Sequence, residues 1–365
     1  MSKPKPIKLT DKSYFAWEYE EQTKIKHKVL GAYSKVWIAK LGKYNDTMFF
    51  DCHAGCGAYI DLISQEVSYG SSFIVEDVAD KLNKNRQHKN YICACEIDKS
   101  SYDNYKQVAS DIGKNTISLK NQDFHIVLDD LKVKRYYSSH PTLFFVDPFG
   151  YTMKMSAIEK MMVNNKNEVF INFMFDYLNR FLAVSDENLL DDFFGTHDWV
   201  NANNLTGTPR EEYLIELYRN QVKKATGAKY VFSYKISYPD RDKTYYYLVH
   251  ATNHIDGITH MKEAFASVNN GRVQYLGKNN NVMSFFDFSF LKADEIYNSC
   301  LIPLKGQSIT FQELWESIVE ATAYTSKDLS EALAELVKSG KIEVKRVTSK
   351  RCSYKENDII KVIWG

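Results

Sequence analysis

The chain of 365 residues is long enough for two domains, or for one large domain with an appendage. Its 47 Lys and Arg residues against 46 Asp and Glu residues give a formal net charge of +1, which excludes a polycation that coats nucleic acid indiscriminately. We find no run of about eighteen apolar residues and no hydrophobic segment typical of a signal peptide, so we expect a cytoplasmic protein.

The first periodic stretch is residues 13–41, which we expect to form one helix or a helix pair. Apolar residues recur there at helical spacing, among them Ile25, Val29 and Tyr33. The lysines of this stretch fall on other faces: Lys24, Lys26, Lys28 and Lys35. The segment TKIKHK has two interpretations, a phosphate-contacting patch and a solvated helix face, and charge patterning favours the solvated face.

The segment MFFDCHAGCGAY, residues 48–59, follows as an apolar strand, an acid and a glycine loop. Gly55 and Gly57 suit a backbone that must turn sharply and let a ligand approach. Asp51 at the end of the strand can accept a hydrogen bond from the ammonium or hydroxyl group of a ligand. The same spacing also occurs in ordinary turns, so the interpretation depends on the rest of the chain. Gly70, Ser71 and the residues after them predict a turn and the start of a helix.

Two further strands are predicted to end in polar groups. YICACEID, residues 91–98, places Glu96 where a doubly wound fold puts the carboxylate that binds a ribose diol, although a solvated acid at a strand end fits equally well. A third strand at 116–119 precedes a loop whose polar and aromatic groups suit an adenine edge. That loop consists of Asn121, Gln122, Asp123 and Phe124.

The segment PTLFFVDPFG, residues 141–150, is a wholly apolar strand that ends in Asp147, Pro148, Phe149 and Gly150. This ending is also a common turn sequence. A fifth strand, EVFINFMF, comes after a short helix. Strands that alternate with helices predict a parallel sheet with a site at the carboxyl ends of its strands.

The sequence after residue 175 predicts three parts: an insertion, a hairpin and a winged helix. Residues 176–228 form a mostly helical insertion, after which YVFSYKISYP and TYYYLVHATN form an antiparallel hairpin. From about Gly306, two amphipathic helices, the second capped by Ser326, and two short strands follow the order of a winged helix. Eight Lys or Arg residues and three acids lie between 338 and 361. Four of these basic residues are our nucleic-acid-binding candidates: Lys345, Arg346, Lys350 and Arg351. A winged helix that docks on protein is the alternative.

The six cysteines are few for this length, and we expect free thiols. Cys52, Cys56, Cys93 and Cys95 could be drawn as a metal set. Neither of their spacings is that of a zinc knuckle, so we expect no metal site.

Taken together, the glycine loop with Asp51, the acids Glu96 and Asp123, the end of the fourth strand and the terminal hairpin resemble a class I S-adenosylmethionine-dependent methyltransferase. Within that superfamily the chain is similar to the three-Cys-motif partner (TcmP) family of bacteria and phages. The similarity covers roughly residues 10–365 and rests on KHKVLGAYSKVW, FFDCHAGCG, FVDPFG and YYYLVHATNHIDGITHMKEAF. Ser72 departs from the small proline usual at that position, and His53 and Cys56 are departures within the loop.

The resemblance implies a Rossmann-like α/β fold, mostly parallel with an antiparallel terminal hairpin. It divides the chain into an N-terminal helical segment (1–45), a methyltransferase domain (46–300) and a winged-helix domain (306–365). S-adenosylmethionine is the implied cofactor, and the residues implied to bind it are Asp51, His53, Gly55, Gly57, Glu96, Asp123 and Phe124.

The end of the fourth strand is similar to that of tRNA N2-guanine dimethyltransferases. The resemblance therefore implies that Asp147 and Pro148 hold a target amino group and that Phe149 stacks on its base. Positioning and one carboxylate suffice for such chemistry. The leading hypothesis is a methyltransferase acting on an exocyclic amino group of RNA or DNA. The alternative is a non-catalytic or conditional binding partner of a companion three-Cys-motif protein.

Overall fold

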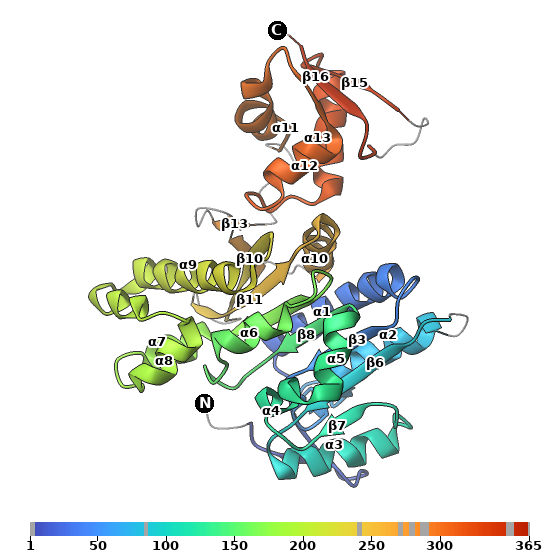
Figure 1. Ribbon diagram of the computed structural model, residues 1–365, viewed down its shortest axis with the longest axis vertical. Helices are drawn as coiled ribbons and strands as arrows, with labels where there is room; N and C mark the ends of the chain where they lie inside the picture. Colours follow the sequence, from blue (N-terminus) through green and yellow to red (C-terminus); the bar gives the residue numbers. More distant parts are fainter. Residues whose placement is uncertain are drawn as a thin grey trace. The chain divides into compact units, whose positions relative to one another are not determined.

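The computed structural model describes residues 4–83, 87–238, 243–268, 273–276, 282–284, 292–347 and 354–363. The chain divides into two compact units, Met1–Gly257 and Ile258–Gly365 (Figure 1). The domain boundaries suggested by the sequence remain predictions.

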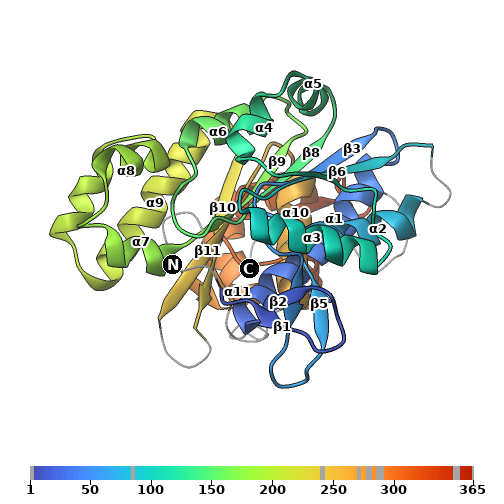
Figure 2. The ribbon, with the colours of Figure 1, turned by 90° about the horizontal axis from the view of Figure 1, so that it is seen from below.

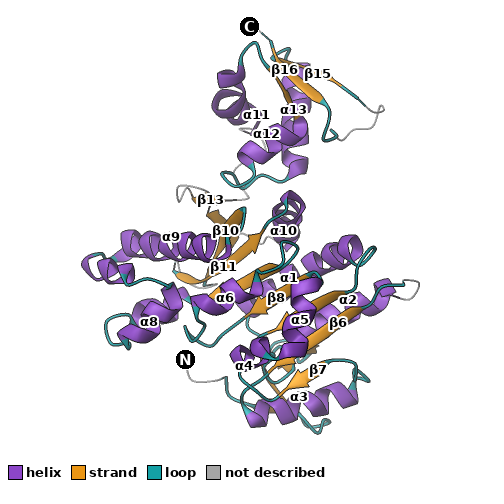
Figure 3. Cartoon of the chain, viewed as in Figure 1, coloured by secondary structure: helices purple, strands orange, loops and turns teal. Residues whose placement is uncertain are grey.

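A mostly parallel sheet forms the centre of the first unit. Its strands are β3 (Thr47–Asp51), β6 (Asn90–Cys95), β7 (Ser118–Lys120), β8 (Thr142–Val146), β9 (Glu168–Phe173), β10 (Tyr230–Ser237) and β11 (Thr244–Thr252). Within this unit they lie in the order β10-β11-β9-β8-β3-β6-β7 (Figure 3). β3 pairs in parallel with β6 and β8, whereas β11 pairs antiparallel with both β9 and β10. The predicted fold class, a Rossmann-like methyltransferase sheet with an antiparallel terminal hairpin, is confirmed.

Helices cover both faces of this sheet, which explains why every residue of β3 and β8 is buried. The helices before the insertion are α1 (Glu21–Leu41), α2 (Ser71–Asn83), α3 (Lys99–Asp111), α4 (Phe124–Asp129), α5 (Leu131–Ser139) and α6 (Met155–Met161). Helices α1 and α2 pack together on one face, and α4 and α6 pack together on the other (Figure 2).

Residues 13–20 are not helical, contrary to the sequence-based expectation. A small sheet forms there in the order β1-β2-β4-β5, from β1 (Ile7–Lys8), β2 (Phe15–Glu18), β4 (Ala58–Ile60) and β5 (Val67–Tyr69). The side chain of Asn104 on α3 binds the backbone of Phe15 in both directions, at 2.8 and 2.9 Å. These tertiary hydrogen bonds favour the extended conformation, so the helix begins at Glu21.

The insertion is helical, as predicted. Its helices are α7 (Phe175–Phe181), α8 (Glu187–Phe194), the 3-10 helix η1 (Asp198–Asn204) and α9 (Gly207–Thr226). α9 ends at Gly227, which adopts the left-handed conformation that glycine tolerates. Helix α10 (Ile255–Val268) follows the hairpin, as expected.

The second unit contains the predicted helix-helix-wing order. Two helices, α12 (Phe311–Ile318) and α13 (Ser326–Lys338), accompany a sheet of β14 (Ser308–Thr310), β16 (Ile359–Val362) and β15 (Ile342–Lys345), in that order. Thr325, not the predicted Ser326, caps α13, because its hydroxyl accepts from the Asp328 N–H in a capping box.

The remaining described elements of this unit are β12 (Val273–Leu276), β13 (Val282–Ser284), α11 (Lys292–Ile296), the π-helix η2 (Tyr297–Leu301) and the 3-10 helix η3 (Ile302–Leu304). Of the helices in the described parts of both units, none is long and apolar enough to cross a membrane.

Candidate active site

Four acids lie at or just beyond the carboxyl ends of neighbouring parallel strands. Asp51 ends β3, Glu96 follows β6, Asp123 precedes α4 and Asp147 follows β8. The sheet order β7-β6-β3-β8 brings these positions to one edge of the sheet, where open α/β sheets bind ligands. We call these four residues the carboxylate row.

The glycine loop is held by Glu96 of this row. Gly55 (φ +65°) and Gly57 (φ +85°) are both left-handed. The backbone N–H of Gly55 donates to Glu96 Oε2 at 2.9 Å, and the N–H of Asp98 donates to Glu96 Oε1 at 2.7 Å. A Cβ atom on Gly57 would lie 3.1 Å from both Phe73 and Tyr105, so the loop needs glycine for packing as well as for its dihedral angles.

Asp51 is fully buried and binds two hydroxyl groups. Ser71 Oγ and Ser72 Oγ donate to its Oδ2 at 2.5 and 2.6 Å. Ser72, where the resemblance implied a proline, therefore contributes a hydrogen bond that proline could not make. Burial raises the pKa of Asp51 to about 6, although the two hydroxyls act in the opposite direction.

At the β7 end of the row, two histidine rings flank the buried Phe124. His53 lies edge-on to Phe124 at 5.0 Å, and the His125 ring is 3.9 Å from it between ring centroids. Asp123 accepts from the His125 N–H at 2.8 Å. Burial lowers the pKa of His53 to about 4, so its ring is neutral at pH 7. His53 Nδ1 and His125 Nε2 are both buried and have no partner among the described residues.

The Asp147 carboxylate makes an ion pair and a hydrogen bond that the sequence did not suggest. Lys26 Nζ on α1 pairs with its Oδ2, and Asn172 Nδ2 on β9 donates to its Oδ1 at 2.7 Å. Burial alone would raise the pKa of Asp147, but Lys26 and Asn172 outweigh it and hold that pKa below its ordinary value. Lys26 is itself buried, so the interpretation of TKIKHK as a solvated face is wrong at this position.

Aromatic rings surround the approach to Asp147. Phe149 is 39% exposed and lies edge-on to Trp17, with the centroids 5.5 Å apart. Trp17 also covers the glycine loop, since a Cβ on Gly55 would lie 2.8 Å from its ring. Pro148, which lies between Asp147 and Phe149 in the sequence, is buried. Trp17 thus connects the cofactor candidates to the substrate candidates.

The sequence did not predict that Trp17, Lys26 and Asn172 belong to this site. Asn172 carried a signal, because it is polar within the otherwise apolar run Val169–Phe173. Lys26 stood out only as part of TKIKHK, for which a solvated face was favoured, and Trp17 carried no signal, since a tryptophan in a short strand has an ordinary explanation.

The winged-helix candidates differ in their surroundings. Lys345 is exposed at the end of β15. The guanidinium of Arg346 lies 3.8 Å over the Tyr354 ring, and its Nη1 is 3.4 Å from Asp358 Oδ2. Arg346 therefore also stabilises the wing. Lys350 and Arg351 lie outside the described residues.

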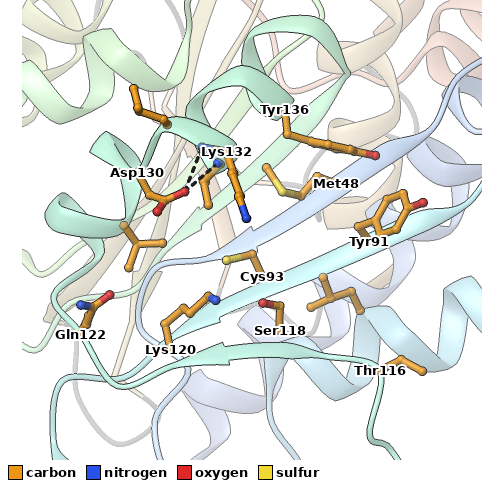
Figure 4. Close-up of a pocket in the computed structure, with 14 residues that line it drawn as sticks. Met48, Tyr91, Cys93, Thr116, Ser118, Lys120, Gln122, Asp130, Lys132 and Tyr136 are labelled. Atoms are coloured by element: carbon orange, nitrogen blue, oxygen red, sulfur yellow. Dashed lines mark hydrogen bonds between the residues drawn. The ribbon is translucent and has the colours of Figure 1, made fainter.

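A separate hollow of about 880 Å³ lies between α5 and strands β6 and β7 (Figure 4). Cys93, Lys120 and Lys132 are among the residues that line it, and the carboxylate row is not. The described cysteines are free thiols, and no group of His, Cys, Asp and Glu in the described ranges is arranged to hold a metal ion.

Comparison with known proteins yields one family match, and it covers only part of the chain. The model of the GMT-like wHTH domain matches residues 293–349, so this part of the chain is a winged helix-turn-helix domain. No curated protein matches the chain.

Several solved structures are similar at low identity. One is protein LPL1258 from Legionella pneumophila, with a TM-score of 0.42, 10% identity, and coverage of 72% of this chain and 96% of that one. Another is an rRNA methylase from Streptococcus thermophilus, with a TM-score of 0.32 and 12% identity. The match covers 64% of this chain and 97% of that one. A third is M. jannaschii TYW2 in complex with AdoMet, with a TM-score of 0.32 and 11% identity. The match covers 68% of this chain and 84% of that one.

Proposed function

We propose that the chain is an S-adenosylmethionine-dependent methyltransferase that acts on an exocyclic amino group of a nucleic-acid base. The observation that carries the proposal is Asp147, an ionised carboxylate beyond β8 that lies beside an unpartnered acceptor, Asn172 Oδ1. Together they offer two acceptors to the two N–H groups of an amine. The division of the chain into domains 1–45, 46–300 and 306–365 is part of the proposal. The segment 1–45 contains the strands β1 and β2 as well as the predicted helix.

The residues of the carboxylate row fit the proposed cofactor. Asp51, Gly55 and Gly57 would contact its methionine portion, and Glu96 its ribose hydroxyls. Asp123 and Phe124 would hold the adenine. The unpartnered ring nitrogens of His53 and His125 support this, because an adenine edge carries both donors and acceptors for them. When bound, S-adenosylmethionine supplies a methyl group activated for transfer to nitrogen.

The orientation of the Asn172 amide follows from its neighbours. A carboxylate oxygen can only accept, so the group that faces Asp147 Oδ1 at 2.7 Å must be the amide NH₂. The amide oxygen is thereby directed elsewhere. It is buried and has no partner within the described part of the chain. A target amine that donates to it would satisfy a group that is otherwise costly to bury.

Asp147 would accept the second N–H of the amine. Lys26 keeps the Asp147 carboxylate ionised at neutral pH, and the carboxylate can then take the proton that the amine loses after methyl transfer. Phe149 would stack on the base and hold the nitrogen in line with the methyl carbon. Trp17, packed against both Phe149 and the glycine loop, would keep water out of this space.

The experiment has two stages. Calorimetry with S-adenosylmethionine tests the cofactor, and mass spectrometry of nucleosides from cells with and without the protein identifies the base. Asp147→Asn should keep cofactor affinity but abolish methylation. Asp129→Asn is the matched control, because Asp129 pairs with the exposed Lys160 on α6. Loss of methylation in both variants, or in neither, would contradict the role of Asp147.

A second candidate function, a non-catalytic or conditional partner of a companion protein, is favoured by one observation. The carboxylates of Asp51 and Glu96 already bind groups within the chain, two serine hydroxyls and two loop N–H groups. Cofactor binding without any change in methylated nucleosides, in cells that contain the companion, would support this candidate instead.

A further inference from the structure

We propose that the chain binds a single-stranded nucleic acid along helix α7, on an aromatic series formed by Phe149, Tyr177 and Phe181. The proposal deepens the proposed function, since it identifies the strand that flanks the target base at Phe149. It concerns residues of the first unit only and does not involve the winged helix.

The aromatic series begins beside Asp147. Tyr177 packs against Gly150, the residue after Phe149, so closely that a Cβ there would lie 3.0 Å from the ring. The centroids of Tyr177 and Phe181 are 4.8 Å apart, one helical turn along α7. Phe149 and Phe181 are each 39% exposed. Partly exposed rings in sequence next to a substrate site can stack successive bases.

Two cations accompany the series and pair with the same acid. The buried Asp176 pairs with Arg180 Nη2 at 3.1 Å and with Lys243 Nζ. Tyr238 Oη also donates to Asp176 Oδ2 at 2.8 Å. Both cations remain about half exposed, with Arg180 at 49% and Lys243 at 46%. Both cations share one buried acid and keep exposed N–H groups, which suit a phosphate.

A single strand fits these features better than a duplex. Stacking needs bases with an open face, and paired bases do not offer one. The target amine must also reach Asp147, which lies beyond Phe149 and is largely buried, with 18% of its side chain exposed. The flanking nucleotides would then lie over Tyr177 and Phe181, with a phosphate near Arg180.

The test uses the full-length chain and fluorescence anisotropy with a labelled single strand and its duplex. Phe181→Ala should weaken single-strand binding at least about fivefold, the low end for one base stack. Arg180→Gln should reduce the slope of log affinity against log salt concentration by about 0.7. Val184→Ala and Lys160→Gln are the matched controls. Val184 is 79% exposed three residues past α7, and Lys160 is 44% exposed on α6.

Unchanged affinity in Phe181→Ala, or equal losses in Phe181→Ala and Val184→Ala, would overturn the proposal. So would equal binding of strand and duplex, or an unchanged salt slope in Arg180→Gln, which would indicate a surface for protein. Circular dichroism of each variant checks the fold. Single-strand binding that depends on Phe181 without any methylated nucleoside would leave this surface in place and reject the proposed activity. Methylation of a nucleoside, combined with single-strand binding that does not depend on Phe181, would support the proposed activity and reject this surface.

Discussion

The ion pair between Lys26 and Asp147 predicts a specific pattern of stability changes. Lys26→Met removes the cation and keeps a side chain of similar length, which leaves the carboxylate with Asn172 as its main partner. Asp147→Asn removes the opposite charge. In the double variant neither charge remains. If the two groups stabilise the fold through each other, the double variant should be more stable than Lys26→Met alone.

The magnitude follows from burial. The side chains of Lys26 and Asp147 are 7% and 18% exposed, so the pair lies between the surface and interior limits. Removal of one partner of a buried pair costs about 3–5 kcal/mol, and we expect about 3 kcal/mol for Lys26→Met because water still reaches Asp147. The double variant should recover about 2 kcal/mol of this loss, since no uncompensated charge is then buried.

The pH dependence has a definite sign. In the wild type the pKa of Asp147 is lowered, so its contribution to stability is present above the unfolded pKa of about 3.9 and is lost as the pH falls through the folded pKa. Without Lys26, burial dominates and the pKa of Asp147 rises. The ionised carboxylate then destabilises the variant at pH 7, and protonation relieves it. The difference in unfolding free energy between wild type and Lys26→Met should therefore shrink from pH 7 to pH 5.

Urea unfolding followed by tryptophan fluorescence measures these differences, since urea, unlike guanidinium, does not screen charges. Equal stability of Lys26→Met and the double variant at pH 7 would refute the reasoning. A difference from wild type that does not change between pH 7 and pH 5 would also refute it, and would assign the effect of Lys26 to packing.

Two further predictions concern the glycine loop and the wing. Gly57→Ala should destabilise the chain by at least about 1 kcal/mol more than Gly113→Ala in the same urea assay. Both glycines are left-handed, but their surroundings differ. A Cβ atom added at Gly57 would meet side chains, whereas a Cβ atom added at Gly113 would have nothing within 4 Å. Arg346→Ala should lower the thermal midpoint of the second unit, because the cation lies over Tyr354, while Lys345→Ala should leave it unchanged. Lys345→Ala should instead reduce the salt slope of nucleic-acid binding by about 1, measured by anisotropy.

The sheet could be predicted from the sequence because its strands are buried on both faces. Wholly buried and largely apolar segments such as β8 have few alternatives in a chain of this kind, and helical segments between them imply parallel pairing. Three of the acids follow from the same logic, since Asp51, Glu96 and Asp147 are each the first polar residue after an apolar run, whereas Asp123 comes after the polar residues that end β7. Their position at one edge of the sheet then depends only on strand order.

The partners of Asp147 could not be predicted, because they come from elements remote in the sequence. Lys26 precedes Asp147 by 121 residues and lies in a helix whose other lysines are not buried. A single sequence does not tell which lysine of an amphipathic helix faces a carboxylate. The strand over Phe15–Glu18 was missed for a related reason, since its partners include β4 and the side chain of Asn104.

Two carboxylates of the row have pKa values displaced in opposite directions, and this difference yields the last prediction. Burial raises the pKa of Asp51 to about 6, because its partners are neutral hydroxyls, whereas Asp147 has a cationic partner. If Asp51 accepts the ammonium of S-adenosylmethionine, it must be ionised. Cofactor affinity should then fall about tenfold for each pH unit below about 6, and Asp51→Asn should weaken binding at pH 7.5 and remove this dependence. Calorimetry between pH 5 and 8 measures both. Affinity that stays constant over this range would mean that Asp51 only anchors Ser71 and Ser72 and does not contact the cofactor.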